Sequence, residues 1–152
     1  MRIVALTQQE AERFRDQIVL LYYRNMRACA HMESFTYEDA CRKMDDLVFH
    51  LGNGTCVAYV ALDGDEVCGF VWAYPHRWRD EERMYVSEIR VREGWRRRGI
   101  GTELLRLVEE RAREMGLGAL YLHAEADNPD VVRLYESLGY VTERVQLRKG
   151  IG

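Results

Sequence analysis

Residues 86–115 (VSEIRVREGWRRRGIGTELLRLVEERAREM) decide the fold of this chain. The first six residues alternate apolar and polar side chains with period two, which predicts a β-strand. From Thr102 onward apolar residues recur at the spacing of an amphipathic helix, at Leu104, Leu105, Val108, Ala112 and Met115. A basic turn with two glycines separates the strand from the helix. The stretch therefore predicts a strand, a turn and a helix in direct succession.

The turn has the composition of an anion-binding loop, and it reads Arg96-Arg97-Arg98-Gly99-Ile100-Gly101. The first turn of a helix carries unpaired N–H groups, and the helix dipole favours negative charge there. Gly99 and Gly101 would let a ligand approach the backbone closely. The pattern predicts a cradle for a phosphate or pyrophosphate, although a tight turn on a solvated basic surface would look the same. A nucleotide-binding loop is disfavoured because G-x-x-x-x-G-K-[ST] is missing.

The composition favours a soluble, cytoplasmic protein of one domain. A chain of 152 residues with 47% hydrophobic content is long enough to bury a core. Its net charge of −3 argues against general binding of nucleic acid. We find no apolar signal region and no run near the ~18 apolar residues that a membrane span needs. We therefore expect neither a nucleic-acid partner nor a membrane.

Four cysteines are widely spaced and form no C-x-x-C pair: Cys29, Cys41, Cys56 and Cys68. This spacing predicts free, buried thiols in a reducing compartment rather than disulfides or a zinc site. No metal is expected.

The N-terminal third predicts one strand and two helices. Residues 2–6 read as a short strand, and Thr7 begins a capping-box pattern for a helix that runs to about Ala30. Thr36 is a second N-cap candidate, and the helix that follows it is predicted to end at the glycines near Gly54.

The middle of the chain predicts a hairpin. Two β-rich runs, residues 55–62 and 66–74, flank the turn signal centred on Gly64. Pro75 is predicted to close the second run, and residues 76–83 are predicted to form a loop before the central strand.

After the long helix the pattern predicts a strand over residues 119–124 and a short helix over residues 130–138, ended by Gly139. Residues 140–149 read as a final pair of strands. The element order β, α, α, β, β, β, α, β, α, β, β predicts a mixed α/β sheet with helices on its faces. Neither a repeat nor a linker is present, so residues 1–152 are predicted to be a single domain.

A second motif, NPDVVRLYESLGY, covers residues 128–140. The two motifs together resemble those of the GNAT superfamily of N-acetyltransferases: Q/R-x-x-G-x-G/A in the turn, then N-x-x-A-x-x-L-Y-x-x-x-G-F/Y. Val131 departs from the usual alanine, and Arg97 stands where many members carry glycine. The resemblance covers essentially the whole chain. It implies a single-domain mixed, splayed β-sheet of about seven strands flanked by about four helices.

The resemblance also implies a binding site for acetyl-CoA. Ile89 and Val91 would pair through their main chains with the pantetheine arm, as an added strand pairs with a sheet edge. Asn128 would meet the pantetheine side. The pyrophosphate would lie on the turn and the start of the helix, at Arg96, Arg97, Arg98, Gly99, Ile100, Gly101 and Thr102.

The implied chemistry is direct transfer of an acetyl group from acetyl-CoA to an amine. A lysine-like amine has a pKa near 10.4, so exposing its lone pair at pH 7 costs roughly 4.6 kcal/mol and a base is valuable. Glu88, on the central strand, is the first candidate for that base, and His123 is the second. Tyr135 matches the family tyrosine that donates a proton or hydrogen bond to the departing sulfur.

The acceptor is a primary amine on a small molecule, a protein N-terminus or a lysine. Aromatic and acidic residues available for its pocket would suit a cationic amine: Glu33, Phe35, Tyr37, Trp72, Tyr74 and Glu88. One alternative is a non-catalytic module that binds or senses acyl-CoA; another uses a longer acyl group or an oxygen nucleophile. Strands at the C-terminal edge would favour a homodimer by family habit.

Overall fold

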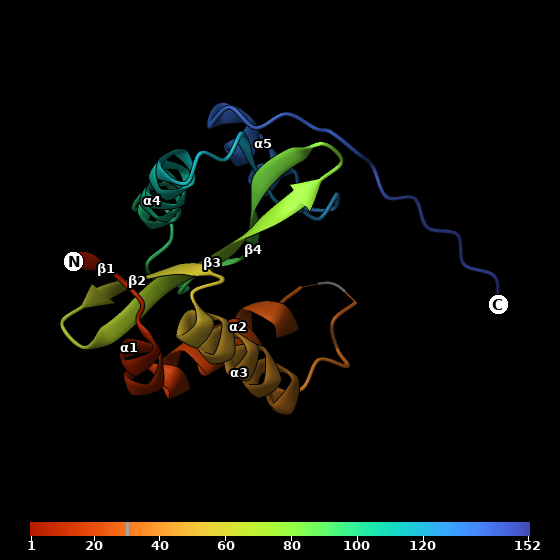
Figure 1. Ribbon diagram of the computed structural model, residues 1–152. Coiled ribbons are helices and arrows are strands. Elements are labelled where there is room, and N and C mark those ends of the chain that lie inside the picture. The colour runs from red at the N-terminus through yellow and green to blue at the C-terminus, as the bar shows by residue number, and fades with distance from the viewer. Residues whose placement is uncertain (30) are drawn as a thin grey trace. The chain divides into compact units, whose positions relative to one another are not determined.

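One mixed β-sheet forms the framework of the chain, with its strands in sequence order across the sheet (Figure 1). The computed structural model describes residues 1–29 and 31–152. Its strands are β1 (Arg2–Ala5), β2 (Val57–Asp63), β3 (Glu66–Trp78), β4 (Glu81–Val91) and β5 (Ala119–Tyr121). The chain divides into two units, Met1–Leu122 and His123–Gly152, and each is described by itself. All five strands belong to the first unit.

The sheet changes from antiparallel to parallel at its last pair. Strands β1 to β4 pair antiparallel, whereas β5 runs parallel to β4. A parallel pair needs a crossover connection, which α4 (Ile100–Glu114) provides. β5 pairs with β4 only from Arg83 to Tyr85, although β4 continues to Val91. Among the described strands, the second half of β4 therefore has a partner on one edge only, as a splayed sheet requires.

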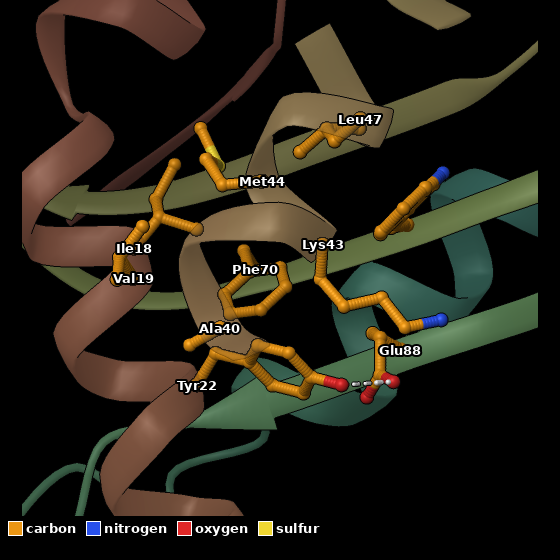
Figure 2. A pocket seen from close by; sticks show the side chains of 10 residues that line it. Ile18, Val19, Tyr22, Ala40, Lys43, Met44, Leu47, Phe70 and Glu88 are labelled. Atoms are coloured by element: carbon orange, nitrogen blue, oxygen red, sulfur yellow. Dashed lines mark hydrogen bonds between the residues drawn. The ribbon is translucent and has the colours of Figure 1, made fainter. Parts of the chain in front are cut away.

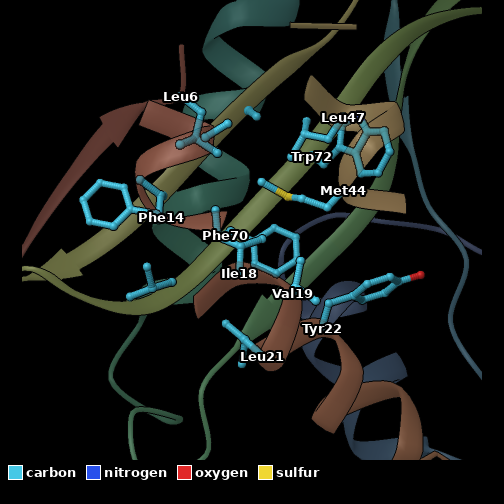
Figure 3. Packing of buried hydrophobic residues seen from close by; sticks show 14 of the residues in the cluster. Leu6, Phe14, Ile18, Val19, Leu21, Tyr22, Met44, Leu47, Phe70 and Trp72 are labelled. Atoms are coloured by element: carbon cyan, nitrogen blue, oxygen red, sulfur yellow. The ribbon is translucent and has the colours of Figure 1, made fainter. Parts of the chain in front are cut away.

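Helices cover both faces of this sheet (Figure 1). On one face lie α1 (Gln8–Arg13), α2 (Arg15–Arg27) and α3 (Tyr37–Asn53), and α4 lies on the other. Figure 3 shows the first of these layers, in which side chains of α2 and α3 pack onto Phe70 and Trp72 of β3. On the opposite face Leu104 and Val108 of α4 are fully buried.

Two helices replace the one predicted after the first strand. Phe14 leaves helical geometry, with φ −100° and ψ 10°, and separates α1 from α2. Its ring is only 2% exposed, so the break coincides with burial of a large apolar side chain in the core. The capping box at Thr36 and the left-handed Gly54 at the end of α3 are confirmed. The end predicted at Ala30 lies outside the described residues, and α2 ends at Arg27.

The predicted loop over residues 76–83 is wrong, because β3 and β4 continue past Pro75 as a long hairpin. Pro75 lies opposite Met84, and the hairpin turns after Trp78 at Arg79, where φ is 54°. Because β2 begins opposite Ala73, β3 has no strand partner on that side at Pro75. Proline is tolerated at such edge positions because no donor is needed there.

The second unit contains one helix, α5 (Pro129–Ser137), and no strand among its residues. Asn128 caps α5, and Gly139, with φ 96°, follows its end as predicted. The final strand pair predicted over residues 140–149 is wrong, because the apolar side chains expected to point inward are exposed, with Leu147 at 89%. A strand with neither a ladder partner nor a buried face gains too little to form.

Residues 1–29 and 31–152 thus form five strands and five helices, rather than about seven and about four. The difference comes from the break at Phe14 and from the absent C-terminal strands. A homodimer was expected because of those C-terminal edge strands, so this reason for expecting it no longer holds. A single domain over residues 1–152 stays a prediction.

Candidate active site

The open edge of β4 presents its main chain at Ile89 and Val91. The Arg92 N–H donates to the Cys68 C=O at 2.8 Å, so residues 92 and 90 face β3. In an antiparallel ladder alternate residues face opposite edges. The N–H and C=O groups of Ile89 and Val91 therefore point to the edge that β5 has left, where an extended ligand can add to the sheet.

Beyond this edge lies the cofactor turn, by which we mean residues 96–102. Gly99 is the N-cap of α4 with φ 78°, and Arg97 also adopts a positive φ of 64°. No side chain caps the helix, so the first N–H groups of α4 are available to a ligand. A Cβ on Gly101 would meet only Val91 Cγ2, at 3.8 Å, so the fold itself does not require glycine there. These features fit an anion such as a pyrophosphate.

The arginines of the cofactor turn are exposed. Arg96 Nε lies 3.4 Å from the Val91 carbonyl oxygen, which ties the turn to the end of β4. The Arg98 guanidinium lies over the Trp95 ring, 4.6 Å from its centroid. Both positive charges therefore stay close to the N-terminus of α4 and strengthen its attraction for an anion.

Glu88 is held from two sides on the face of the sheet that α2 and α3 cover. Its Oε1 accepts a hydrogen bond from the Tyr22 hydroxyl at 3.0 Å. Its Oε2 accepts from Arg90 Nε at 3.1 Å and from the terminal nitrogen at 2.8 Å. A carboxylate offers about four lone-pair sites, so one on Oε1 remains for a further donor.

A β-bulge directs Glu88 to this face. Trp72 pairs with Glu88 and Ala73 pairs with Val86, which leaves Ser87 as an extra residue in β4. Bulges re-aim side chains and are common next to active sites. Glu88 therefore lies on the face of its partner Trp72, over the helices α2 and α3, and because of Ser87 it lies on the face opposite to Val86.

Glu88 closes one end of a small cavity between α2, α3 and the sheet (Figure 2). We call this space the acceptor cavity; it is lined by Ile18, Val19, Tyr22, Ala40, Lys43, Met44, Leu47, Phe70, Trp72 and Glu88. About 10 Å³ of it is open to the centre of a water molecule, which is roughly the room that one water or one amine nitrogen needs. The wall is mostly apolar, with Glu88 and Lys43 as its charged side chains.

Two buried donors belong to this cavity. The Tyr22 side chain is 5% exposed, and burial together with the nearby Glu88 charge raises the pKa of its hydroxyl above the ordinary value. Tyr22 therefore remains a donor to Glu88 at physiological pH. The Trp72 indole N–H is also buried, and no protein group among the described residues accepts its hydrogen bond.

The sequence patterns did not identify Tyr22, Arg90 or Lys43 as parts of this site. Tyr22 belongs to the predicted apolar face of its helix, which gave no sign of its hydroxyl's role. Arg90 stands two residues from Glu88, and on a strand that spacing places two side chains on one face. The i, i+2 pair of opposite charges was the available signal.

The second unit holds the other predicted residues. The Asn128 side chain caps α5 by accepting from the Val131 N–H at 3.4 Å. The Tyr135 ring packs against Tyr140 with centroids 5.6 Å apart. His123 is exposed and lies beyond the end of β5 rather than on it. The structure therefore brings together the predicted residues of β4 and the cofactor turn, and describes Asn128 and Tyr135 within their own unit.

Neither a metal centre nor a membrane helix is found in the described part of the chain. No three His, Cys, Asp or Glu side chains gather there in a way that could hold a metal ion. No helix of residues 1–29 and 31–152 has both the length and the apolar character that crossing a bilayer requires. The four cysteines are free thiols.

Comparison with known proteins identifies the family. The pattern of the Acetyltransferase (GNAT) family matches residues 18–140, and the chain belongs to this family. It is therefore an acyltransferase that acetylates, with acetyl-CoA as the acetyl donor.

Among relatives, the chain is 26% identical to the uncharacterized N-acetyltransferase YdgE of Bacillus subtilis, over 95% of this chain and 94% of YdgE. It is 36% identical to the mycothiol acetyltransferase of Corynebacterium efficiens, but over 54% of this chain and only 27% of that protein. The chain thus spans about a quarter of the mycothiol enzyme's length.

Solved structures show the same fold. A tetramutant of the BH1408 protein from Bacillus halodurans superposes with a TM-score of 0.82 at 16% identity, over 99% of this chain and all of that one. The aminoglycoside N-acetyltransferase AAC(6')-Iy in complex with CoA superposes with a TM-score of 0.73 at 16% identity, over 98% and 93% of the two chains.

Proposed function

We propose that this protein is an N-acetyltransferase that transfers the acetyl group of acetyl-CoA directly to a primary amine. The observation that carries the proposal is the Glu88 carboxylate, held by Tyr22 and Arg90 at the end of a cavity beside the open edge of β4. This arrangement supports an amine nitrogen in the acceptor cavity and a thioester at the edge of the strand.

In this proposal Ile89 and Val91 bind the pantetheine arm through their main chains. The cofactor turn binds the pyrophosphate through the N–H groups of residues 99–102, with Arg96, Arg97 and Arg98 adding positive charge. Asn128 contacts the pantetheine side. Binding the donor at both ends fixes the thioester carbon, so that positioning supplies much of the rate.

Glu88 acts as the base. Its remaining lone pair on Oε1 accepts the proton that the amine loses as it attacks the thioester carbonyl, directly or through one water. Its fixed orientation supports this role, because a mobile carboxylate would have to be ordered in each turnover. Tyr135 donates a hydrogen bond or proton to the sulfur of the leaving thiolate.

A thiol-release assay with a panel of primary amines tests the proposal. Acetylated product, identified by mass spectrometry, is expected together with one equivalent of free CoA. Tyr135→Phe should lower kcat much more than the affinity for acetyl-CoA. Unchanged turnover in that variant would remove Tyr135 from the mechanism, and tight acetyl-CoA binding with no acetylated amine would favour a sensing module instead.

A further inference from the structure

Two acidic side chains near the acceptor cavity, Glu88 and Asp39, have cationic partners. The Glu88 carboxylate forms an ion pair with Arg90 at 2.8 Å, and their side chains are only 12% and 21% exposed. The Arg90 guanidinium also lies over the Tyr22 ring, 5.4 Å from its centroid, which holds it in place. The pair contributes no net charge to the cavity.

A second carboxylate, Asp39 in the first turn of α3, also acts on Tyr22 through its charge. Its Oδ2 accepts from the Thr36 backbone N–H at 2.9 Å, and its Oδ1 is bonded to Arg42. Those hydrogen bonds lower the pKa of Asp39, so it stays ionised but neutralised by its neighbour. It leaves no free negative charge to attract a cationic amine.

Lys43 is the charged group of the cavity without such a partner. It lies on α3 and lines the cavity together with Glu88, and Figure 2 shows its side chain extending toward that carboxylate. Lys43 forms no ion pair with another residue in the described part of the chain. With the Glu88 charge balanced by Arg90, the ammonium of Lys43, an exposed residue of the cavity wall, is a positive charge without an ion-pair partner in the described residues.

We propose that Lys43 is a specificity-determining residue that favours acceptors in which a carboxylate accompanies the amine, as in an amino acid, over polycationic amines. The inference rests on the proposed function and names its substrate class. An ammonium at the cavity attracts an anionic group and repels a second cation. The sequence alone suggested a cationic amine, because it showed the acids without their partners.

The same charge balance favours an amine of modest basicity. Glu88 shares its negative charge with Arg90, so it draws a protonated amine into the cavity less strongly than a lone carboxylate would. At pH 8 about half of a peptide-like α-amine with a pKa of 7.7–8.0 is already neutral, against roughly one molecule in 250 for a lysine-like amine. The amine of a free amino acid is more basic than that of its amide, because its own carboxylate stabilises the ammonium. Basicity alone therefore favours the amide, and a preference for the acid would report the charge of Lys43.

The experiment compares each of several amino acids with its own amide, and adds spermidine as a polycation. The amide has the less basic amine, so reactivity governed by amine basicity alone would favour it. We expect kcat/KM for the acid to exceed that for the amide by at least tenfold, with spermidine the poorest acceptor. Lys43→Glu should invert the order, and the change should fall mainly on KM.

A matched control is Arg2→Glu, which makes the same change of charge on the exposed strand β1, away from the cavity. It should leave the acid-to-amide ratio unchanged. A wild-type preference for amides or spermidine, or a ratio that Lys43→Glu does not move, would overturn the inference and leave the proposed function standing. If no amine of any charge is acetylated, the result contradicts both the inference about Lys43 and the proposed function.

Discussion

The cofactor turn and the acceptor cavity adjoin the same strand, and they are made of different parts of the chain. The turn consists of main chain: a left-handed Gly99, an uncapped helix and the outward amides of β4. The cavity consists of side chains from α2, α3 and the sheet, whose separation along the sequence reaches 66 residues in the Tyr22–Glu88 hydrogen bond. In the proposed function the turn binds acetyl-CoA, which is the same in every reaction, and the cavity binds the acceptor amine, which can vary.

This difference explains why the two sites respond differently to sequence change. A main-chain site needs only the glycines and the strand–turn–helix context, so many side chains can change around it. A side-chain cavity changes with each substitution on three elements. Family members can therefore share the donor and differ in the acceptor.

The largest expected effect is on kcat in the variant Glu88→Gln, which should change the acceptor cavity and leave the cofactor turn intact. Glu88→Gln keeps the size of the side chain and removes the base, so we expect kcat to fall by about 10²–10⁴-fold. The affinity for acetyl-CoA, measured by calorimetry, should stay the same. Glu93→Gln, on the exposed segment after β4, is the matched control and should keep full activity. An equal loss of acetyl-CoA affinity in Glu88→Gln would mean that the two sites are not separate.

The next largest effect is on the affinity for acetyl-CoA, and we expect it from Gly101→Ala, which changes the cofactor turn alone. Its Cβ meets only Val91 Cγ2 at an ordinary 3.8 Å, and alanine is favoured over glycine within a helix by about 0.5–1 kcal/mol. We expect the melting temperature to hold or rise while the affinity for acetyl-CoA falls about tenfold, because the methyl group would meet the ligand. Unchanged affinity would show that the pyrophosphate does not approach Gly101.

How far the sequence predicts each site follows the same division. The strand, turn and helix of residues 86–115 are local, so their pattern was sufficient to predict the second half of β4, the helix α4 and the exposed amides between them, but not the start of β4 at Glu81. The partnership of Tyr22 with Glu88 depends on how α2 packs on the sheet, and no pattern in either segment encodes it. The C-terminal strands were predicted from the local sequence of residues 140–149, and the exposed Leu147 shows that a strand-like sequence without a buried face does not make a strand.

A smaller effect concerns Tyr22. Tyr22→Phe removes a hydrogen bond to a charged group, worth about 1.5–3 kcal/mol, so both stability and kcat should fall while acetyl-CoA affinity stays constant. Burial, and then the charge and hydrogen bond of Glu88, raise the pKa of Tyr22, so the folded state favours the protonated hydroxyl. This contribution to stability is complete below about pH 10 and is lost as pH rises through the higher folded value.

Absorbance at 295 nm, taken as wild type minus Tyr22→Phe, should therefore show a phenol that ionises later than a free tyrosine. In Glu88→Gln the same difference should move to lower pH, because one cause of the shift has gone. A titration of Tyr22 at the ordinary pKa would contradict the geometry of the cavity.

The smallest expected effect tests how tightly the core packs between the sheet and the helices α2 and α3. Burial raises the pKa of Cys56 to about 11, and this residue packs against the core that includes Tyr22 and Trp72. At pH 8 only about 0.1% of such a thiol is thiolate, so Cys56 should react with a disulfide reagent far more slowly than an unperturbed cysteine. Comparison with Cys56→Ser, which lacks this thiol, shows which kinetic phase of the reaction belongs to Cys56. If the phase that disappears in this variant is a fast one, the result would contradict the burial of Cys56.

The Ser87 bulge brings onto one face two side chains of β4 that a regular strand would separate. Tyr85 and Glu88 are three positions apart, a separation that in a regular strand points two side chains in opposite directions, yet they pair with Tyr74 and Trp72 on one side of the sheet. Deleting Ser87 would close the bulge into a regular ladder in which Val86 still pairs with Ala73 and Glu88 still pairs with Trp72. The carboxylate would then keep its face, and β4 would lose only the local bend and twist that a bulge gives a strand. We therefore expect this deletion to lower activity less than Glu88→Gln does, and the remaining loss measures what the bend itself contributes.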